Sequence, residues 1–190
     1  MQGGTIRNNT GLTGGGVSME AGKFTMSGST ATISGNTITI SNATASTAGG
    51  GGLCMTGGTF NFDAGKISDH TISNANGAGV AITGGNMIMQ TGSTGIITNN
   101  RTNFSKDVYR GGGVWIWLGS SSAGSLYKKG GTIYGRDNGD LGNYIYNGSS
   151  HQLDKGAAVL YSINGSTWKR RETTAGTGID LDTNGSGNWE

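Results

Sequence analysis

The chain has 190 residues, which is enough for one domain or one elongated array with a continuous core. Glycine accounts for 39 residues and proline for none. A helical domain is disfavoured because each glycine costs a helix about 1 kcal/mol, and the missing Gly-X-Y period excludes collagen. The formal net charge of +2 comes from Lys and Arg that are scattered apart from residues 169–171, so we predict no nucleic-acid partner.

The first complete repeating unit covers residues 14–36, with the sequence GGGVSMEAGKFTMSGSTATISGN. It contains three short segments of alternating apolar residues, separated by glycine-containing turns and closed by Asn36. Such alternation predicts three strands, each with one side facing a core. The core-facing residues, in chain order, are Val17, Met19, Phe24, Met26 and Ile33.

The same order recurs in units that start near residues 14, 50, 77, 111 and 156, and their alignment produces three apolar columns. The first column contains Val17/Met19, Leu53/Met55, Val80/Ile82, Val114/Ile116 and Val159/Tyr161. The second contains Phe24/Met26, Phe60/Phe62, Met87/Met89 and Leu126/Lys128. The third contains Ile6, Ile33, Ile67, Ile97 and Ile133, followed three residues later by Asn9, Asn36, His70, Asn100 and Arg136.

One such unit cannot form a core alone, because two apolar residues per strand bury too little area to offset the entropy of ordering the backbone. Stacking the units places like residues on one another. We therefore predict an all-β chain, a right-handed parallel β-helix of about five three-strand coils over residues 1–172, with a C-terminal cap over residues 173–190. Residues 37–49, 101–110 and 136–155 are insertions of unassigned role. Disorder is disfavoured, because only 13% of the residues are charged.

The pattern GGGV…GKFTM…ATISGN resembles the glycine-rich repeats of bacterial surface and secreted proteins, notably repeat proteins of spirochaetes. It is more distantly similar to the repeats of chlamydial polymorphic outer-membrane proteins and autotransporter-like adhesins. The resemblance covers residues 1–134 and resumes at residue 156, and the last residues look like the closing segment of such arrays. It implies a scaffold for adhesion or ligand display without a shared active site, located outside the cell or on a bacterial surface.

The aromatic residues of the fourth unit are the candidate ligand-binding site. In GVWIWLG, strand alternation directs Trp115 and Trp117 outward, where two indoles form an apolar platform suited to stacking on a sugar ring. The remaining candidates lie close by in the chain and would suit a neutral polysaccharide; they are Tyr109, Tyr127, Asp107 and Arg110. The alternatives are that the insertions fold over the indoles or that another domain packs on them.

Catalytic, metal and cofactor sites are not predicted. A lyase or glycoside hydrolase needs carboxylates that converge from neighbouring coils, and no two aspartates share a column in adjacent units. Asp180 and Asp182 could hold calcium, but closing the end of the array is the favoured role. The outward second-column residues are Thr25, Asn61, Ile88 and Tyr127, which are too irregular for ice binding.

The side chains of Cys54, His70 and the column asparagines have structural interpretations. A single cysteine excludes an internal disulfide framework, so Cys54 is a small residue on a strand. His70 takes the place of an asparagine in a stacked amide column, in which each side chain bonds to its neighbours and to turn backbone.

The sequence thus favours a non-catalytic extracellular binding or adhesion module with a carbohydrate or other cell-surface ligand and no cofactor. It would be part of a larger multidomain protein whose signal peptide lies upstream of Met1, since no apolar run is long enough for a membrane span and the first residues have no signal pattern. The first alternative is an inert spacer or stalk, in which both indoles would be buried. A polysaccharide lyase or glycoside hydrolase is the last alternative.

Overall fold

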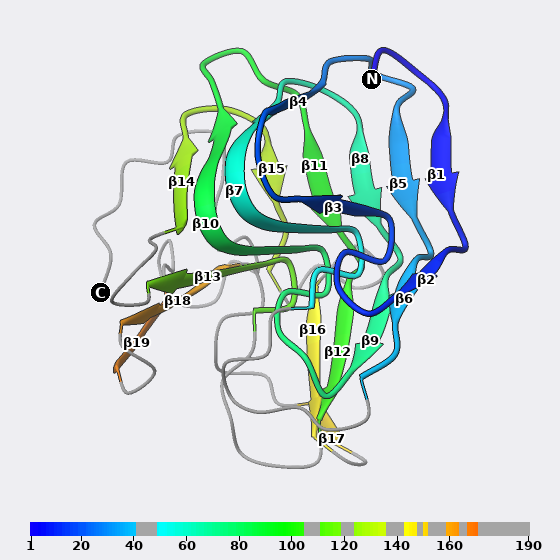
Figure 1. Ribbon diagram of the computed structural model, residues 1–190, viewed down its shortest axis with the longest axis vertical. Helices are drawn as coiled ribbons and strands as arrows, with labels where there is room; N and C mark the ends of the chain where they lie inside the picture. The colour runs from blue at the N-terminus through cyan, green and yellow to red at the C-terminus, as the bar shows by residue number, and fades with distance from the viewer. Residues whose placement is uncertain are drawn as a thin grey trace.

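The computed structural model describes residues 1–40, 49–104, 111–118, 124–135, 143–147, 150–151, 159–163 and 167–170. This part of the chain is all-β and contains no helix, and its sheets are built mainly from parallel strands that come from successive repeats (Figure 1). Parallel neighbours from successive repeats are what the aligned columns predict, because every repeat must bury its apolar residues on the next one.

An eight-stranded sheet holds the first and second columns together. Its main path is β19 (Thr167–Arg170), β18 (Val159–Ile163), β13 (Val114–Leu118), β10 (Val80–Met89), β7 (Leu53–Phe62) and β3 (Val17–Met19). Beside this path, β4 (Lys23–Met26) pairs with β7 and β14 (Gly124–Lys128) pairs with β10. All pairs are parallel except β18–β19, which is antiparallel.

The registers of this sheet confirm the alignment of the first two columns. Valine and leucine positions of the first column pair directly, in the order Val17, Leu53, Val80, Val114 and Val159. In the second column the order is Phe24, Phe60, Met87 and Leu126.

The third column forms a five-stranded parallel sheet, with the order β1 (Thr5–Arg7), β5 (Thr32–Ser34), β8 (Lys66–Ser68), β11 (Ile96–Thr98) and β15 (Thr132–Ile133). Its five isoleucines lie in one row, as the sequence predicts; they are Ile6, Ile33, Ile67, Ile97 and Ile133. From Ile33 onward this row is completely buried.

The prediction of three separate strands per repeat is wrong in two respects. In β7 and β10 the first two segments form one continuous strand of 10 residues, because the glycines between them allow a bulge instead of a break. A further set of strands follows the third column, in β2 (Thr10–Gly11), β6 (Thr37–Ile38), β9 (Thr71–Ser73), β12 (Arg101–Phe104), β16 (Tyr144–Asn147) and β17 (Ser150–His151).

Four of these additional strands, β6, β12, β16 and β17, occupy parts of the predicted insertions 37–49, 101–110 and 136–155. They form the sheets β2–β6 and β17–β16–β12–β9, in which all pairs but β16–β17 are parallel. Their physical basis is a second apolar cluster of Ile38, Ile72, Ala75 and Ala78, on which Ile40 packs. β-Branched residues at alternate positions favour a strand here as they do in the third column.

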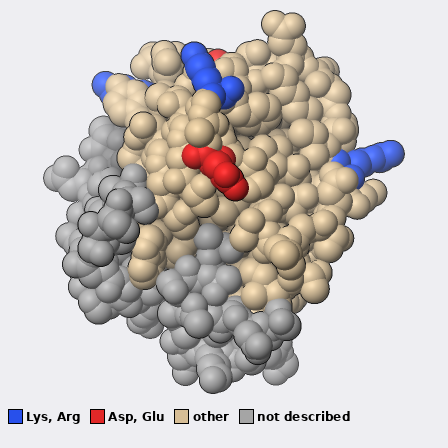
Figure 2. Space-filling model, viewed as in Figure 1, with Lys and Arg blue, Asp and Glu red and all other residues tan. Residues whose placement is uncertain are grey.

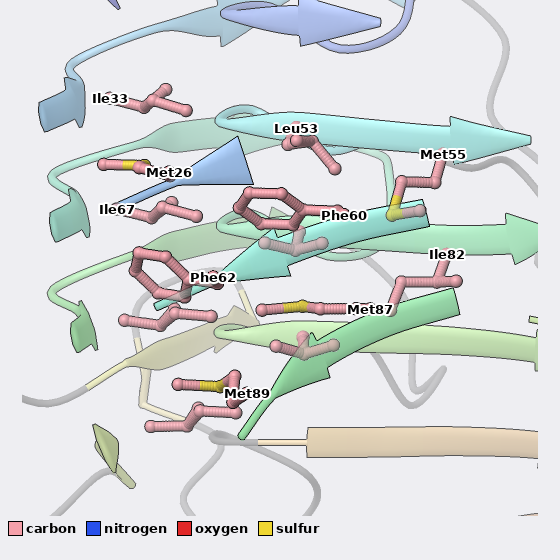
Figure 3. Packing of buried hydrophobic residues seen from close by; sticks show 14 of the residues in the cluster. Met26, Ile33, Leu53, Met55, Phe60, Phe62, Ile67, Ile82, Met87 and Met89 are labelled. Carbon is pink, nitrogen blue, oxygen red and sulfur yellow. The ribbon is translucent and has the colours of Figure 1, made fainter. Parts of the chain in front are cut away.

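The main core consists of side chains stacked in rows along successive repeats (Figure 3). The ring centroids of Phe24 and Phe60 are 5.3 Å apart, and those of Phe60 and Phe62 are 5.5 Å apart, both in stacked geometry. Met26, Met87 and Phe62 are likewise fully buried. Because each such side chain contributes about 1.5–3 kcal/mol on burial, the stability of one repeat depends on its neighbours.

The glycine triplet that opens the repeats at residues 14, 50 and 111 is required for two different reasons. Gly50 has a φ of 61°, and a Cβ there would lie 2.1 Å from the carbonyl oxygen of Leu53. Gly52 has no such φ, but a Cβ there would lie 2.6 Å from the carbonyl oxygen of Gly79 in the next repeat. The triplet therefore provides both a left-handed turn and a close approach between backbones.

Candidate functional site

A ladder of polar side chains runs along the corner between the five-stranded sheet and the additional strands. Each ladder residue follows one with left-handed backbone: Asn8, Gly35, Asp69 and Asn99 have φ values of 58°, 61°, 63° and 49°. Glycine, Asn and Asp adopt this conformation at the lowest cost. The corner therefore directs the following residues, Asn9, Asn36, His70 and Asn100, into one column.

The asparagines of the ladder make a repeated pair of hydrogen bonds. The Asn36 Oδ1 accepts a bond of 2.9 Å from the backbone N–H of Asn9, and its Nδ2 donates a bond of 3.1 Å to the carbonyl of Ile6. Asn100 does the same two steps along, accepting from the N–H of His70 and donating to the carbonyl of Ile67. Each amide thus satisfies two backbone groups of the preceding repeat.

His70 reproduces this pattern with an imidazole ring. Its Nδ1 accepts a bond of 3.0 Å from the backbone N–H of Asn36, and its Nε2 lies 3.1 Å from the carbonyl oxygen of Ile33. Nδ1 also lies 3.1 Å from the carbonyl oxygen of Asn36, and a ring that accepts from the Asn36 N–H is neutral and carries its proton on Nε2. His70 is fully buried, as the sequence predicts for a member of the column.

The ionisation of this corner follows from the burial. Burial lowers the pKa of His70 from 6.5 to about 4, against smaller opposing effects of the carbonyl oxygens of Asn36 and Ile33 near its ring nitrogens and of the Asp69 charge. Partial burial acts to raise the pKa of Asp69, but hydrogen bonds from Ser68 and Asn99 lower it below its ordinary value, aided by the Lys66 and His70 charges. Near neutral pH the histidine is therefore uncharged and the aspartate charged. With a pKa of about 4 and both ring nitrogens in structural contacts, the buried His70 is a weak base.

The next member of the ladder is Asn143, which the sequence alignment missed. Its Oδ1 accepts bonds of 2.9 Å from both the backbone N–H and the Nδ2 of Asn100, and its Nδ2 donates to the carbonyls of Ile97 and Tyr134. The aligned residue, Arg136, lies outside the described residues. A signal was present, because Asn143 precedes an alternating strand, β16, just as Asn36 precedes β6.

The predicted tryptophan platform is not exposed. Trp115 and Trp117 point to the same side of β13, with ring centroids 5.7 Å apart, but Trp115 is fully buried and Trp117 is half-buried. The expectation that both indoles stand free is therefore wrong for Trp115. Alternation along the strand correctly places the ring away from the main core, in a separate cluster with Cys54 and Ala81, but burial of this outer cluster is a tertiary property.

Two polar atoms in this outer cluster lack a favourable environment. Within the described residues, the indole Nε1 of Trp115 has no hydrogen-bond acceptor. Burial raises the pKa of the Cys54 thiol to about 11, so the thiolate is a negligible fraction near neutral pH. The cluster thus has the properties of packed interior, in line with the prediction of Cys54 as a small residue on a strand.

Among the predicted site residues that the structure describes, Tyr127 is the most accessible, with 48% of its surface exposed. It lies in one register row with Thr25, Asn61 and Ile88 on the outer face of the eight-stranded sheet. The Lys129 Nζ lies 5.4 Å from the Tyr127 ring centroid, and the adjacent Ser125 hydroxyl donates a bond of 2.6 Å to Asn86 Oδ1. An exposed aromatic ring is thus surrounded by polar side chains on a sheet surface.

The structure does not describe the other predicted site residues. Asp107, Tyr109 and Arg110 lie outside the described residues, as do residues 173–190 with Asp180 and Asp182. In the described part of the chain no group of three or more His, Cys, Asp or Glu is placed to hold a metal ion. Of the aspartates, Asp63 and Asp69 are described, and Asp69 is engaged in the corner hydrogen bonds.

Charged side chains are few and separated on the face shown in Figure 2. The described Lys and Arg residues therefore form no continuous basic surface on this face. Among the described residues, none belongs to a helix with the length and hydropathy needed to cross a membrane.

Comparison with known proteins adds no assignment: no family model, no curated protein and no solved structure matches this chain. The likeness to bacterial glycine-rich surface repeats stays a prediction from the sequence. Function must therefore be argued from the registers, the burial and the exposed residues of this chain alone.

Proposed function

We propose that the chain is a right-handed parallel β-helix that serves as a non-catalytic spacer or scaffold in a secreted or cell-surface protein. The observation that carries this proposal is the register: one residue of every repeat stacks on its equivalent through five successive strands in two columns, from Val17 to Val159 and from Ile6 to Ile133. Each repeat adds one layer to the stack, which is the property that a spacer needs.

The handedness follows from the connections between parallel neighbours. A chain that leaves a strand and returns to a parallel neighbour in the same sheet makes a right-handed crossover in nearly all proteins, because right-twisted strands pack well only that way. The repeats make this connection several times in succession, so all of their crossovers have the same hand.

The buried state of Trp115 favours a spacer over the binding platform that the sequence favours. A stacking platform needs open ring faces, and Trp115 has no exposed surface. The polar ladder does not favour catalysis either, because its members are occupied by structural hydrogen bonds and the histidine has a pKa of about 4.

A second candidate function, the binding of a neutral polysaccharide, has one specific observation in its favour. Tyr127 has an exposed ring on a sheet surface. Asn61 lies in the same register row, and Ser125 and Asn86, which are hydrogen-bonded to each other, lie in the next row on the same face. A pyranose ring can stack on such an aromatic face while its hydroxyls bond to amides and hydroxyls.

Removal of one whole repeat tests the proposed fold. Deletion of residues 50–76 joins Gly49 to Gly77, so that Val17 meets Val80 and Asn36 meets Asn100 in unchanged register. We expect the shortened chain to fold cooperatively with the same β-type circular dichroism spectrum. Deletion of residues 50–63, about half a repeat, is the control and should abolish folding. Equal behaviour of the two deletions would refute the stack.

Titration with a panel of soluble neutral polysaccharides, monitored by calorimetry, separates the two functions. A spacer gives no saturable binding to any member of the panel. Binding that Tyr127→Ala abolishes would instead establish the second function, and Leu12→Ala is a matched control because Leu12 is 76% exposed and lies outside the eight-stranded sheet.

A further inference from the structure

The outer side of the eight-stranded sheet is covered in one half and open in the other. Beside the first column, the outward residues Cys54, Ala81 and Trp115 are buried. Beside the second column, β4, β7, β10 and β14 lie side by side (Figure 1), and each contributes two outward residues that are half-buried or exposed. This second-column face consists of one register row of Lys23, Thr59, Asn86 and Ser125 and another of Thr25, Asn61, Ile88 and Tyr127.

The apolar part of the second-column face lies on β10 and β14. Ile88 and Tyr127 are direct cross-strand neighbours, and 48% of the Tyr127 surface is exposed. In the next row the Ser125 hydroxyl donates to the Asn86 Oδ1, so Asn86 can offer its Nδ2 group to a ligand. An aromatic ring beside amide and hydroxyl groups suits a pyranose, which has both an apolar ring face and hydroxyls.

Lys129 favours an acidic sugar over a neutral one. Its Nζ lies over the Tyr127 ring, 5.4 Å from the centroid, which is a cation–π geometry. A neutral sugar that stacks on this ring displaces the ammonium and offers it no charge in return. A uronic acid offers a carboxylate, with which the ammonium forms a charge-assisted hydrogen bond. The neighbouring strand β10 contains no acidic residue that would compete for the ammonium.

We propose that the second-column face binds a polysaccharide of uronic acids, with one sugar ring stacked on Tyr127 and Ile88 and its carboxylate bonded to the Lys129 Nζ. The sugars that follow lie across β10 and β7, where the amides of Asn86 and Asn61 bind their hydroxyls. The inference rests on the second candidate function, polysaccharide binding, and changes its ligand from a neutral to an acidic chain.

Calorimetric titration with matched oligosaccharides tests the ligand class. The probes are β-1,4-linked oligomers of glucuronic acid and of mannuronic acid. Each is compared with the corresponding oligomer of glucose or mannose, which carries a hydroxymethyl group in place of every carboxylate. The acidic oligomers should bind the unaltered chain up to about fivefold more tightly than the neutral ones, as one exposed ion pair allows. This preference should decline as the salt concentration is raised.

Two variants and a control locate the binding. Tyr127→Ala should lower the affinity for the acidic oligomers about tenfold or more, because the ring provides the stacking surface. Lys129→Gln should remove the preference for acidic over neutral oligomers. Arg7→Gln is the control, because it removes one positive charge from an exposed residue of β1 in the five-stranded sheet, and it should leave the preference unchanged. Circular dichroism spectra of the three variants should match that of the unaltered chain, because all three side chains are exposed.

The outcomes separate this inference from the function on which it rests. Equal affinity for acidic and neutral oligomers, or a preference that Lys129→Gln leaves in place, would overturn the inference while polysaccharide binding stands. If no oligomer binds, both the inference and the second candidate function fail and the spacer function stands. A preference that Arg7→Gln reduces as much as Lys129→Gln does would reflect general attraction to the net positive charge, and this too would overturn the inference.

Discussion

Acidification should destabilise the protein through His70. The ring is neutral and buried in the fold, with a pKa of about 4 against 6.5 for an exposed histidine. As the pH falls below 6.5, the unfolded chain takes up a proton that the folded chain does not accept until about pH 4. Protons therefore favour the unfolded state throughout this range, and stability that is complete above pH 6.5 is lost as the pH falls towards 4.

The size of the effect follows from the two affinities for the proton. A tenfold difference in affinity corresponds to about 1.4 kcal/mol, so the whole range from 6.5 to about 4 is worth about 3 kcal/mol. Between pH 7 and pH 5 the loss should be about 2 kcal/mol. Asp69 acts in a lower window, because its pKa lies below 3.8 and its contribution is lost only as the pH falls below that value.

Two substitutions separate titration from hydrogen bonding. His70→Asn retains an acceptor for the Asn36 N–H and a donor for the Ile33 carbonyl, as Asn100 does in the next repeat, but it cannot titrate. It should keep most of the stability at pH 7 and remove the loss between pH 7 and pH 5. His70→Ala leaves both backbone groups buried without a partner and should cost about 2–4 kcal/mol even at pH 7.

Urea unfolding at several pH values, followed by circular dichroism, provides the free energies. His151→Gln is the control, because His151 is the second of the two histidines in the chain and should leave the pH dependence unchanged. The reasoning fails if His70→Asn unfolds with the same pH dependence as the unaltered chain, or if His151→Gln is the variant that removes it.

Three further predictions concern packing. Gly50→Ala should lower the free energy of unfolding in urea by about 2 kcal/mol or more, since the added Cβ clashes with backbone and the φ is left-handed. Gly92→Ala should lower it by about 1 kcal/mol, because Gly92 has a φ of 85° but no atom lies within 4 Å of the added Cβ. Phe60→Ala should lower the free energy of unfolding by about 3–5 kcal/mol, because the Phe60 ring stacks between two other rings. A smaller loss in thermal and urea unfolding would argue against the stacked core. The Cys54 thiol should react with a disulfide reagent at pH 8 only as fast as the protein unfolds, and rapid labelling would show that its cluster is open.

Much of the fold could be predicted from the local pattern of apolar residues. The apolar couples of the first three columns predict the strand registers correctly, because a stacked repeat offers each inward side chain only its equivalents as neighbours. His70 could be assigned to the ladder for the same reason. The strands that follow the ladder were missed, since β6 and β9 are two and three residues long and carry one inward isoleucine each.

The candidate site could be predicted less well from the sequence than the fold. Alternation along β13 determines that Trp115 faces away from the main core, and a sequence contains that information because the strand period is local. Whether that outer side meets solvent depends on chain segments far away in the sequence, and tertiary packing buries it. Asn143 illustrates the same division: the residue type that the corner requires is readable from Asn36 and Asn100, but only the folded chain decides which asparagine reaches the ladder. The sequence by itself thus determined the layers and their register, and the tertiary structure decided which surfaces remain open to a partner.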